Sequence, residues 1–168
     1  NYNDGTSIPN VTDETTWTEL STGAMCNYEN MPSFSAIYGK IYNWYAVNTG
    51  KLCPAGWHVA TDEEWTTLTN YLGGTEVAGA KLKETDTTHW AKPNSGATNE
   101  TGFTALPAGA RSEFGTFISI HLDGTWWTAT ESDKGTPWFR YMFFDYCTVL
   151  RNYGYGKRSG LSVRCVKD

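Results

Sequence analysis

The sequence is poor in charged residues and has no long apolar run. Only 18% of its 168 residues are charged, against about a quarter in a typical soluble domain. No apolar stretch approaches the roughly 20 residues that cross a bilayer, so direct membrane insertion is not expected. Helical bundles and coiled coils are excluded as well, because they need abundant Ala, Glu, Lys and Leu.

Common catalytic and cofactor motifs are also missing. The chain has no nucleophile elbow, zinc-protease motif, P-loop or dinucleotide fingerprint. Its three histidines, His58, His89 and His121, are scattered, which favours packing or surface roles over metal binding. We therefore predict no enzyme activity, no catalytic residue, no metal site and no cofactor.

Calcium is the one metal that needs separate consideration. Asp123, Glu131 and Asp133 place carboxylates near predicted turns, but their spacing is not that of an EF-hand. We interpret them as solvated turn residues, which leaves calcium binding without support.

Aromatic residues are abundant instead, with 8 Trp, 10 Tyr and 7 Phe, alongside 17 Gly. So many aromatic side chains can bury enough surface to fold a chain of this length. We predict a single, loop-rich globular domain over residues 1–168.

One helix is predicted with a clear local signal. Thr61 and Glu64 have the spacing of a capping box, Trp65 and Leu68 follow at helical spacing, and a Gly-Gly pair at 73–74 ends the segment. A shorter helix is expected over 76–83. Residues 36–47 are ambiguous between helix and strand, and the Asn-Thr-Gly at 48–50 favours a helix.

The second half of the chain predicts strands. Residues 91–109 contain turn residues without a period and are expected to form a long loop. Strand-like runs follow at 115–120, 125–130, 138–144, 148–151 and 161–166, separated by turns. Helices followed by an antiparallel sheet indicate an α+β fold.

Charge is divided unequally along the chain. Residues 1–133 hold 6 Lys and Arg against 16 Asp and Glu, a net charge of −10, whereas residues 134–168 hold 7 against 2, a net charge of +5. The basic segment either neutralises the acidic part within the fold, which we favour, or forms a cationic surface for a partner. The overall charge of −5 argues against a nucleic-acid partner.

The four cysteines do not have the spacing of a zinc site. Cys26, Cys53, Cys147 and Cys165 include no C-x-x-C pair. They allow three disulfide pairings, and the spacing alone does not choose among them.

Aromatic residues and cations concentrate near the C-terminus. Residues 138–146 read WFRYMFFDY, which is too aromatic for both faces of a strand to be buried in so small a domain. Residues 151–158 alternate aromatics, glycines and cations, as binding loops do. Aromatic packing that shields a sheet edge is an equally good interpretation.

Several segments together resemble the Fibrobacter succinogenes major paralogous domain, a family of extracytoplasmic bacterial proteins. The matching segments span nearly the whole chain in the expected order: 38–47 (YGKIYNWYAV), 52–65 (LCPAGWHVATDEEW), 81–84 (KLKE), 99–107 (NETGFTALP), 126–131 (WWTATE) and 162–166 (SVRCV).

The resemblance implies a C-type lectin-like fold of the formylglycine-generating-enzyme branch, with two short helices and a twisted antiparallel sheet. Cys53 and Cys165 match the usual cysteines of the family, which implies a disulfide between them. It makes a Cys26–Cys147 bond doubtful. It also implies an extracellular or cell-surface location, as part of a longer surface protein. The catalytic cysteine pair of the enzymes has no matching positions, so their activity does not carry over.

The chain departs from the family pattern after Trp138, in the manner of lectin-like proteins diversified by retroelements. We therefore expect residues 118–159 to hold a ligand surface for a glycan or a protein on a cell surface. The predicted binding residues are Trp127, Tyr141, Phe143, Tyr146, Asn152, Tyr153, Tyr155 and Arg158. The alternative functions are a formylglycine-generating-type oxidase, which needs two close thiols, and a structural subunit of a surface filament.

Overall fold

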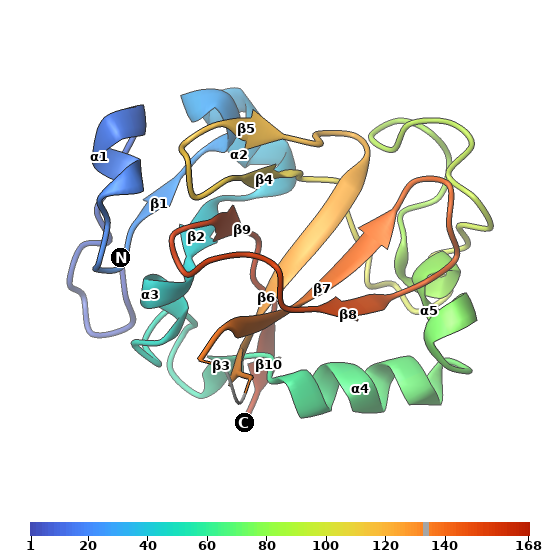
Figure 1. The fold of residues 1–168 in the computed structure, drawn as a ribbon. Coiled ribbons are helices and arrows are strands. Elements are labelled where there is room, and N and C mark those ends of the chain that lie inside the picture. The colour runs from blue at the N-terminus through green and yellow to red at the C-terminus, as the bar shows by residue number, and fades with distance from the viewer. Residues whose placement is uncertain (133–134) are drawn as a thin grey trace.

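The computed structural model describes residues 1–132 and 135–168 and has an α+β architecture (Figure 1). The helices are α1 (Glu14–Thr18), the 3₁₀ helix η1 (Tyr28–Asn30), α2 (Pro32–Tyr38), α3 (Trp44–Val47), α4 (Asp62–Tyr71) and α5 (Thr75–Leu82). Helices α4 and α5 match the two predicted between residues 61 and 83, and further helices lie in the described residues. The additional ones have one or two turns, too few for apolar residues to repeat with a visible period.

The strands of the described residues form three antiparallel sheets. They are β1 (Met25–Cys26), β2 (Ile41–Asn43), β3 (Trp57–Val59), β4 (Ala110–Arg111), β5 (Phe117–Ile118), β6 (Asp123–Glu131), β7 (Pro137–Phe143), β8 (Leu150–Asn152), β9 (Gly160–Leu161) and β10 (Cys165–Lys167). Their orders are β1-β2-β9-β4-β5, β10-β3 and β6-β7-β8. A strand overlaps each predicted run, but the run at 161–166 is divided between β9 and β10, which belong to different sheets. The long loop between α5 and β4 is confirmed.

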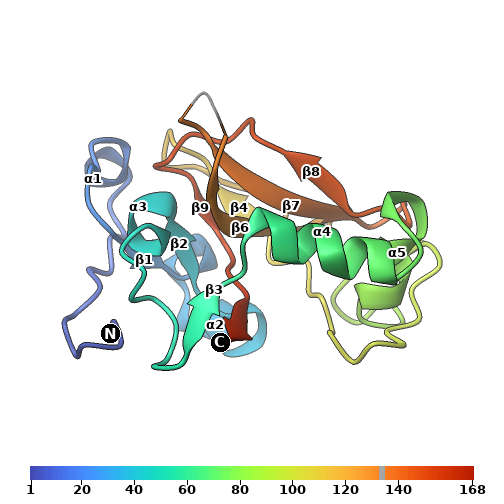
Figure 2. The same ribbon diagram turned by 90° about the horizontal axis from the view of Figure 1, so that it is seen from below.

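Helix α4 begins and ends as its sequence predicts. Thr61 accepts a hydrogen bond from the backbone N–H of Glu64, and the Glu64 carboxylate accepts one from the backbone N–H of Thr61, which completes the capping box. Trp65 is buried, and α5 follows directly after the Gly-Gly turn. The two helices lie along one side of the β6-β7-β8 sheet (Figures 1 and 2).

The prediction of one helix over residues 36–47 is wrong. Helix α2 stops at Gly39, whose φ of 80° is left-handed, and strand β2 follows. Asn43 then caps the short helix α3 by accepting a hydrogen bond from the N–H of Ala46. The helix end predicted from the Asn-Thr-Gly at 48–50 therefore belongs to α3 alone. Strand β2 was not predicted because aromatic residues on every side of this segment obscure its alternation.

The β6-β7-β8 sheet has a hydrophobic cluster on each face. Trp126 and Met142 belong to the cluster with α4 and α5, while Trp127 and Phe139 belong to the cluster with α3 and β9. The expectation that one face of residues 138–146 is free of the core is therefore wrong for much of β7. Its two faces pack against different halves of the molecule.

The Cys53–Cys165 disulfide is present and joins the loop after α3 to β10. Cys26 and Cys147 are free thiols, so the doubt about a bond between them is confirmed. Among the described helices, none has the length and apolar character needed to cross a membrane.

Candidate functional site

A cleft of about 330 Å³ lies against the β6-β7-β8 sheet, and we call it the Asp123 cleft. Its lining residues come from all three strands and the loop after β8: Asp123, Phe139, Tyr141, Asn152, Gly154 and Tyr155. The strand register brings them together, because residues directly opposite in an antiparallel pair share a face. Phe139 pairs with Asn152, and Asp123 pairs with Phe143, diagonal to Tyr141. Segments about 30 residues apart in the chain thus meet in one hollow.

Asp123 is the polar centre of this cleft. The residue is only 8% exposed, and its Oδ1 atom is buried without a hydrogen-bond partner. The interpretation of Asp123 as a solvated turn residue is therefore wrong, because β6 begins earlier than predicted and carries it into the sheet. A buried carboxyl oxygen without a partner is unfavourable, which makes it a ready acceptor for a ligand's donor.

Aromatic rings form the walls of the cleft. The Phe139 and Tyr155 rings lie 4.8 Å apart at an angle of 54°, so they meet as a corner. From Tyr141, a row of rings continues outward through Phe143 at 6.0 Å to Tyr146, whose ring is 5.8 Å from that of Phe143. We call Tyr141, Phe143 and Tyr146 the outer aromatic row. Tyr146 is 54% exposed at its end.

The titratable groups of the cleft have raised pKa values. Burial raises the pKa of Asp123, against a hydrogen bond from Ser119 that lowers it. Burial, together with the charge of Asp123, also raises the pKa of Tyr155 and raises that of Tyr141 to about 12. These raised pKa values indicate that the cleft is shielded from water and that no cation among its lining residues offsets the charge of Asp123.

The structure brings together most of the predicted binding residues but not all. Tyr141, Asn152 and Tyr155 line the cleft, and Phe143 and Tyr146 extend it. Tyr153 is 45% exposed and packs against Trp138, with ring centroids 4.9 Å apart. It therefore lies beside the cleft and not in its lining.

Two further predicted binding residues, Trp127 and Arg158, make contacts within the fold. Trp127 is fully buried beneath the cleft and donates a 2.9 Å hydrogen bond to the carbonyl of Tyr42. Arg158 donates a 2.7 Å hydrogen bond to the carbonyl of Thr18, which attaches the last loop to α1. Placing Trp127 on the ligand surface was wrong, because the sequence pattern does not show which face of β6 is covered. The role of Arg158, whose side chain is 43% exposed, stays a prediction.

Sequence reasoning missed three lining residues, Asp123, Phe139 and Gly154. Phe139 shares the alternation of Tyr141 and Phe143, so its side of the strand was visible in the sequence. Asp123 precedes the predicted strand run, and no sequence signal marks its burial.

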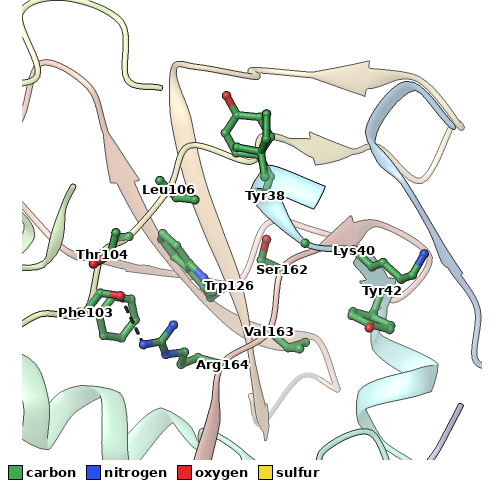
Figure 3. A pocket seen from close by; sticks show the side chains of 13 residues that line it. Tyr38, Lys40, Tyr42, Phe103, Thr104, Leu106, Trp126, Ser162, Val163 and Arg164 are labelled. Atoms are coloured by element: carbon green, nitrogen blue, oxygen red, sulfur yellow. Dashed lines mark hydrogen bonds between the residues drawn. The ribbon is translucent and has the colours of Figure 1, made fainter. Parts of the chain in front are cut away.

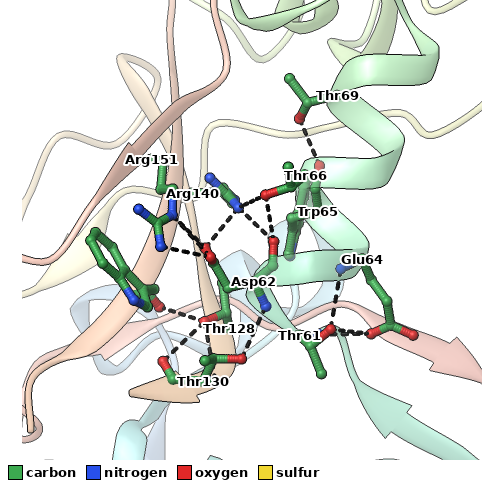
Figure 4. Close-up of polar contacts among 11 residues, drawn as sticks. Thr61, Asp62, Glu64, Trp65, Thr66, Thr69, Thr128, Thr130, Arg140 and Arg151 are labelled. Carbon is green, nitrogen blue, oxygen red and sulfur yellow. Dashed lines mark hydrogen bonds and ion pairs between the residues drawn. The ribbon is translucent and has the colours of Figure 1, made fainter. Parts of the chain in front are cut away.

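Several cations of the C-terminal segment are paired with the acidic part of the chain. Arg140 and Arg151 both contact the Asp62 carboxylate, at 2.7 and 2.9 Å, on the α4 side of the sheet (Figure 4). Lys157 pairs with Glu131. The neutralising interpretation of the charge division is thus supported for these residues, whereas Lys134 and Asp133 lie outside the described residues.

A second hollow of about 370 Å³ lies near Trp126 (Figure 3). Its lining comes from four of the segments that carry the family resemblance. Its polar groups already have partners. Arg164 donates to the Phe103 carbonyl, Tyr38 contacts His121, and the Lys40 ammonium donates to Asn27. The Asp123 cleft is the better candidate because the Oδ1 atom of Asp123 has no hydrogen-bond partner.

The histidines and free thiols form no reactive cluster among the described residues. His58 bridges Glu64 and Asp168, and no group of three or more metal-binding side chains occurs in the described part of the chain. Cys26 belongs to a buried cluster around β1, whereas the Cys147 thiol contacts the Ser95 carbonyl near α5. The two thiols thus lie in different surroundings, which does not favour the oxidase alternative.

Comparison with known proteins places the chain in a family without supplying a function. No curated protein and no solved structure matches it significantly. The family model described as the Fibrobacter succinogenes major domain matches residues 1–167. The chain therefore belongs to the Fibrobacter succinogenes major domain family.

Proposed function

We propose that this chain is a non-enzymatic recognition module that binds a glycan or a protein through the Asp123 cleft and the outer aromatic row. The observation that carries the proposal is the buried, unpartnered carboxyl oxygen of Asp123 in an aromatic cleft. Aromatic faces and a few placed polar groups are the usual means of recognising ligands with both apolar and polar parts.

We also propose a C-type lectin-like fold of the formylglycine-generating-enzyme branch. The α+β architecture, the Cys53–Cys165 disulfide and the succession of β3 and α4 support it. The disulfide is compatible with an extracellular or cell-surface location, where such bonds persist.

Retroelement diversification of residues 118–159 remains part of the proposal. Every residue that lines the Asp123 cleft falls within this range, which is where a variable binding surface is expected. The genomic test is direct. A reverse transcriptase and a template repeat beside the gene would support diversification, and the lack of both would remove it.

A binding screen against glycans and cell-surface proteins tests the function. The wild-type chain is compared with an Asn152→Ala, Tyr146→Ala double variant, both of whose positions are exposed, and with Tyr71→Ala on α4 as the control. We expect the double variant to bind at least about tenfold more weakly, as for loss of interface hot spots, and the control to bind normally. A chelator should have no effect. Undiminished binding by the double variant would place the ligand elsewhere on the molecule.

A further inference from the structure

We infer that the Asp123 cleft recognises an alkylammonium group, such as a lysine side chain, an amino sugar or a methylated amine. The inference rests on the proposed binding function and names the chemical class of its ligand. It draws on the charge of the cleft, the rings around it and the cations elsewhere in the chain.

The cleft contains a carboxyl group and no positive group to balance it. Its six lining residues include one acidic side chain, Asp123, and no lysine or arginine. Asp145, in the turn after β7, is not part of this lining, and the Lys83 ammonium interacts with its carboxyl. A ligand with a negative charge would therefore be repelled, whereas a cation would compensate the carboxylate.

Three arginines in the described part of the C-terminal segment are held away from this carboxyl. Arg140 and Arg151 contact Asp62 on the opposite face of the sheet, and Arg158 reaches Thr18 and Glu113. These three arginines thus have other partners, which leaves a ligand to supply a positive group that balances Asp123.

Three rings make the cleft suited to an organic cation. Phe139, Tyr141 and Tyr155 line it together with the carboxyl. Aromatic rings attract ammonium groups through their quadrupoles, and several rings together form the cages that recognise methylated ammonium ions. The cleft lies at the small end of the size range of ligand pockets, enough for an ammonium head and its alkyl stem.

A metal ion fits the same residues less well. Calcium takes six to eight oxygen ligands, whereas the lining offers a single carboxyl group, one amide and two phenols. A neutral hydroxyl could donate to Asp123, but it would leave the negative charge uncompensated.

The test compares a cation with a neutral molecule of the same shape. Choline chloride and its uncharged carbon analogue 3,3-dimethyl-1-butanol are titrated into the wild-type chain, with amide chemical shifts as the readout. Nα-acetyl-lysine amide, glucosamine and N-acetylglucosamine then separate a protein source of the ammonium from a sugar source. An added chelator removes any contribution of metal ions.

We expect choline to bind at least about tenfold more tightly than its neutral analogue, the ratio that a cation–π and charge interaction of over 1.4 kcal/mol gives. Asp123→Asn should remove this preference, because the amide keeps the shape and an acceptor for Ser119 but not the charge. Glu76→Gln, the same change at an exposed position on α5, should preserve it.

Equal affinity for the two molecules, or shifts outside the cleft, would overturn the inference. If the Asp123→Asn variant does not fold, as a thermal melt would reveal, the charge comparison on the wild type decides alone. A glycan or protein ligand that depends on Asn152 and Tyr146 but not on an ammonium group would overturn the inference while leaving the proposed function intact.

Discussion

Two buried cations in the described residues, Lys83 and Arg111, are supported by backbone carbonyls, whereas one oxygen of the buried Asp123 carboxyl has no partner. The Lys83 ammonium donates to the carbonyls of residues 143, 144 and 146 at 2.9 to 3.4 Å, which fixes the turn that carries the outer aromatic row. Arg111 donates to four carbonyls and stacks over Trp17. Such partners offset the desolvation of the charge. Asp123 has an unpartnered oxygen instead, which is the reason for assigning it to a ligand.

Tyr153 and Tyr155 have different roles despite their proximity in sequence. Tyr155 packs on Phe139 at 4.8 Å and is partly buried with the cluster that contains Trp127, whereas Tyr153 is 45% exposed. Tyr155→Ala should lower the free energy of unfolding by about 2 kcal/mol, roughly half the loss for a fully buried ring. Tyr153→Ala should cost under about 1 kcal/mol. Urea denaturation measures both, and equal losses would contradict this division.

At the level of helices and strands, local signals were sufficient where a cap or an alternation was complete. The capping box at Thr61 and Glu64 marked α4, and the alternation of β7 placed Tyr141 and Phe143 on one side. The sequence did not reveal which other elements pack against that side of the sheet. Trp127 lies under the cleft because α3 and β9 pack there, and contacts between distant segments leave no local pattern. The boundary of β6 decides the burial of Asp123 for the same reason.

His58 connects three elements and makes their attachment sensitive to pH. Its ring contacts Asp168 at 2.6 Å and Glu64 at 2.8 Å, so it links β3, the start of α4 and the residue after β10. These hydrogen bonds, first to Asp168 and then to Glu64, raise the pKa of His58 above its ordinary 6.5. A raised pKa in the folded state means that the stabilisation is complete below pH 6.5 and is lost as pH rises through the folded value.

Thermal melts of the wild type should therefore show a fall in melting temperature as pH is raised from about 6 through the folded pKa of His58. His58→Gln keeps hydrogen-bonding capacity without the titration, so its fall over the same interval should be smaller. His89→Gln is the matched control, since His89 contacts Glu84 in a different part of the fold. If the melting temperature of His58→Gln falls with pH as much as that of the wild type, the contacts of His58 with Asp168 and Glu64 do not cause the pH dependence.

For the whole molecule, the Cys53–Cys165 bond closes a loop that contains most of the fold. It spans 112 residues and includes α4, α5, the β6-β7-β8 sheet and every lining residue of the Asp123 cleft. Constraining so long a loop in the unfolded chain is worth about 4 to 5 kcal/mol in the loop-entropy model. That is a large share of the 5 to 15 kcal/mol that stabilises a typical domain.

Reduction of the wild type should accordingly lower the denaturation midpoint in urea, with a loss of about 2 to 5 kcal/mol. A Cys26→Ser, Cys147→Ser variant retains only the disulfide cysteines, so its response to the reductant isolates the bond from effects on the free thiols. We expect the same shift in both chains, and no shift in a Cys53→Ser, Cys165→Ser variant. The cleft is assembled from strands inside the closed loop. The amide shifts that choline induces in the reduced wild type should therefore disappear over the same urea concentrations as its folded structure. Binding that outlasts global unfolding would show that the cleft does not depend on this closure.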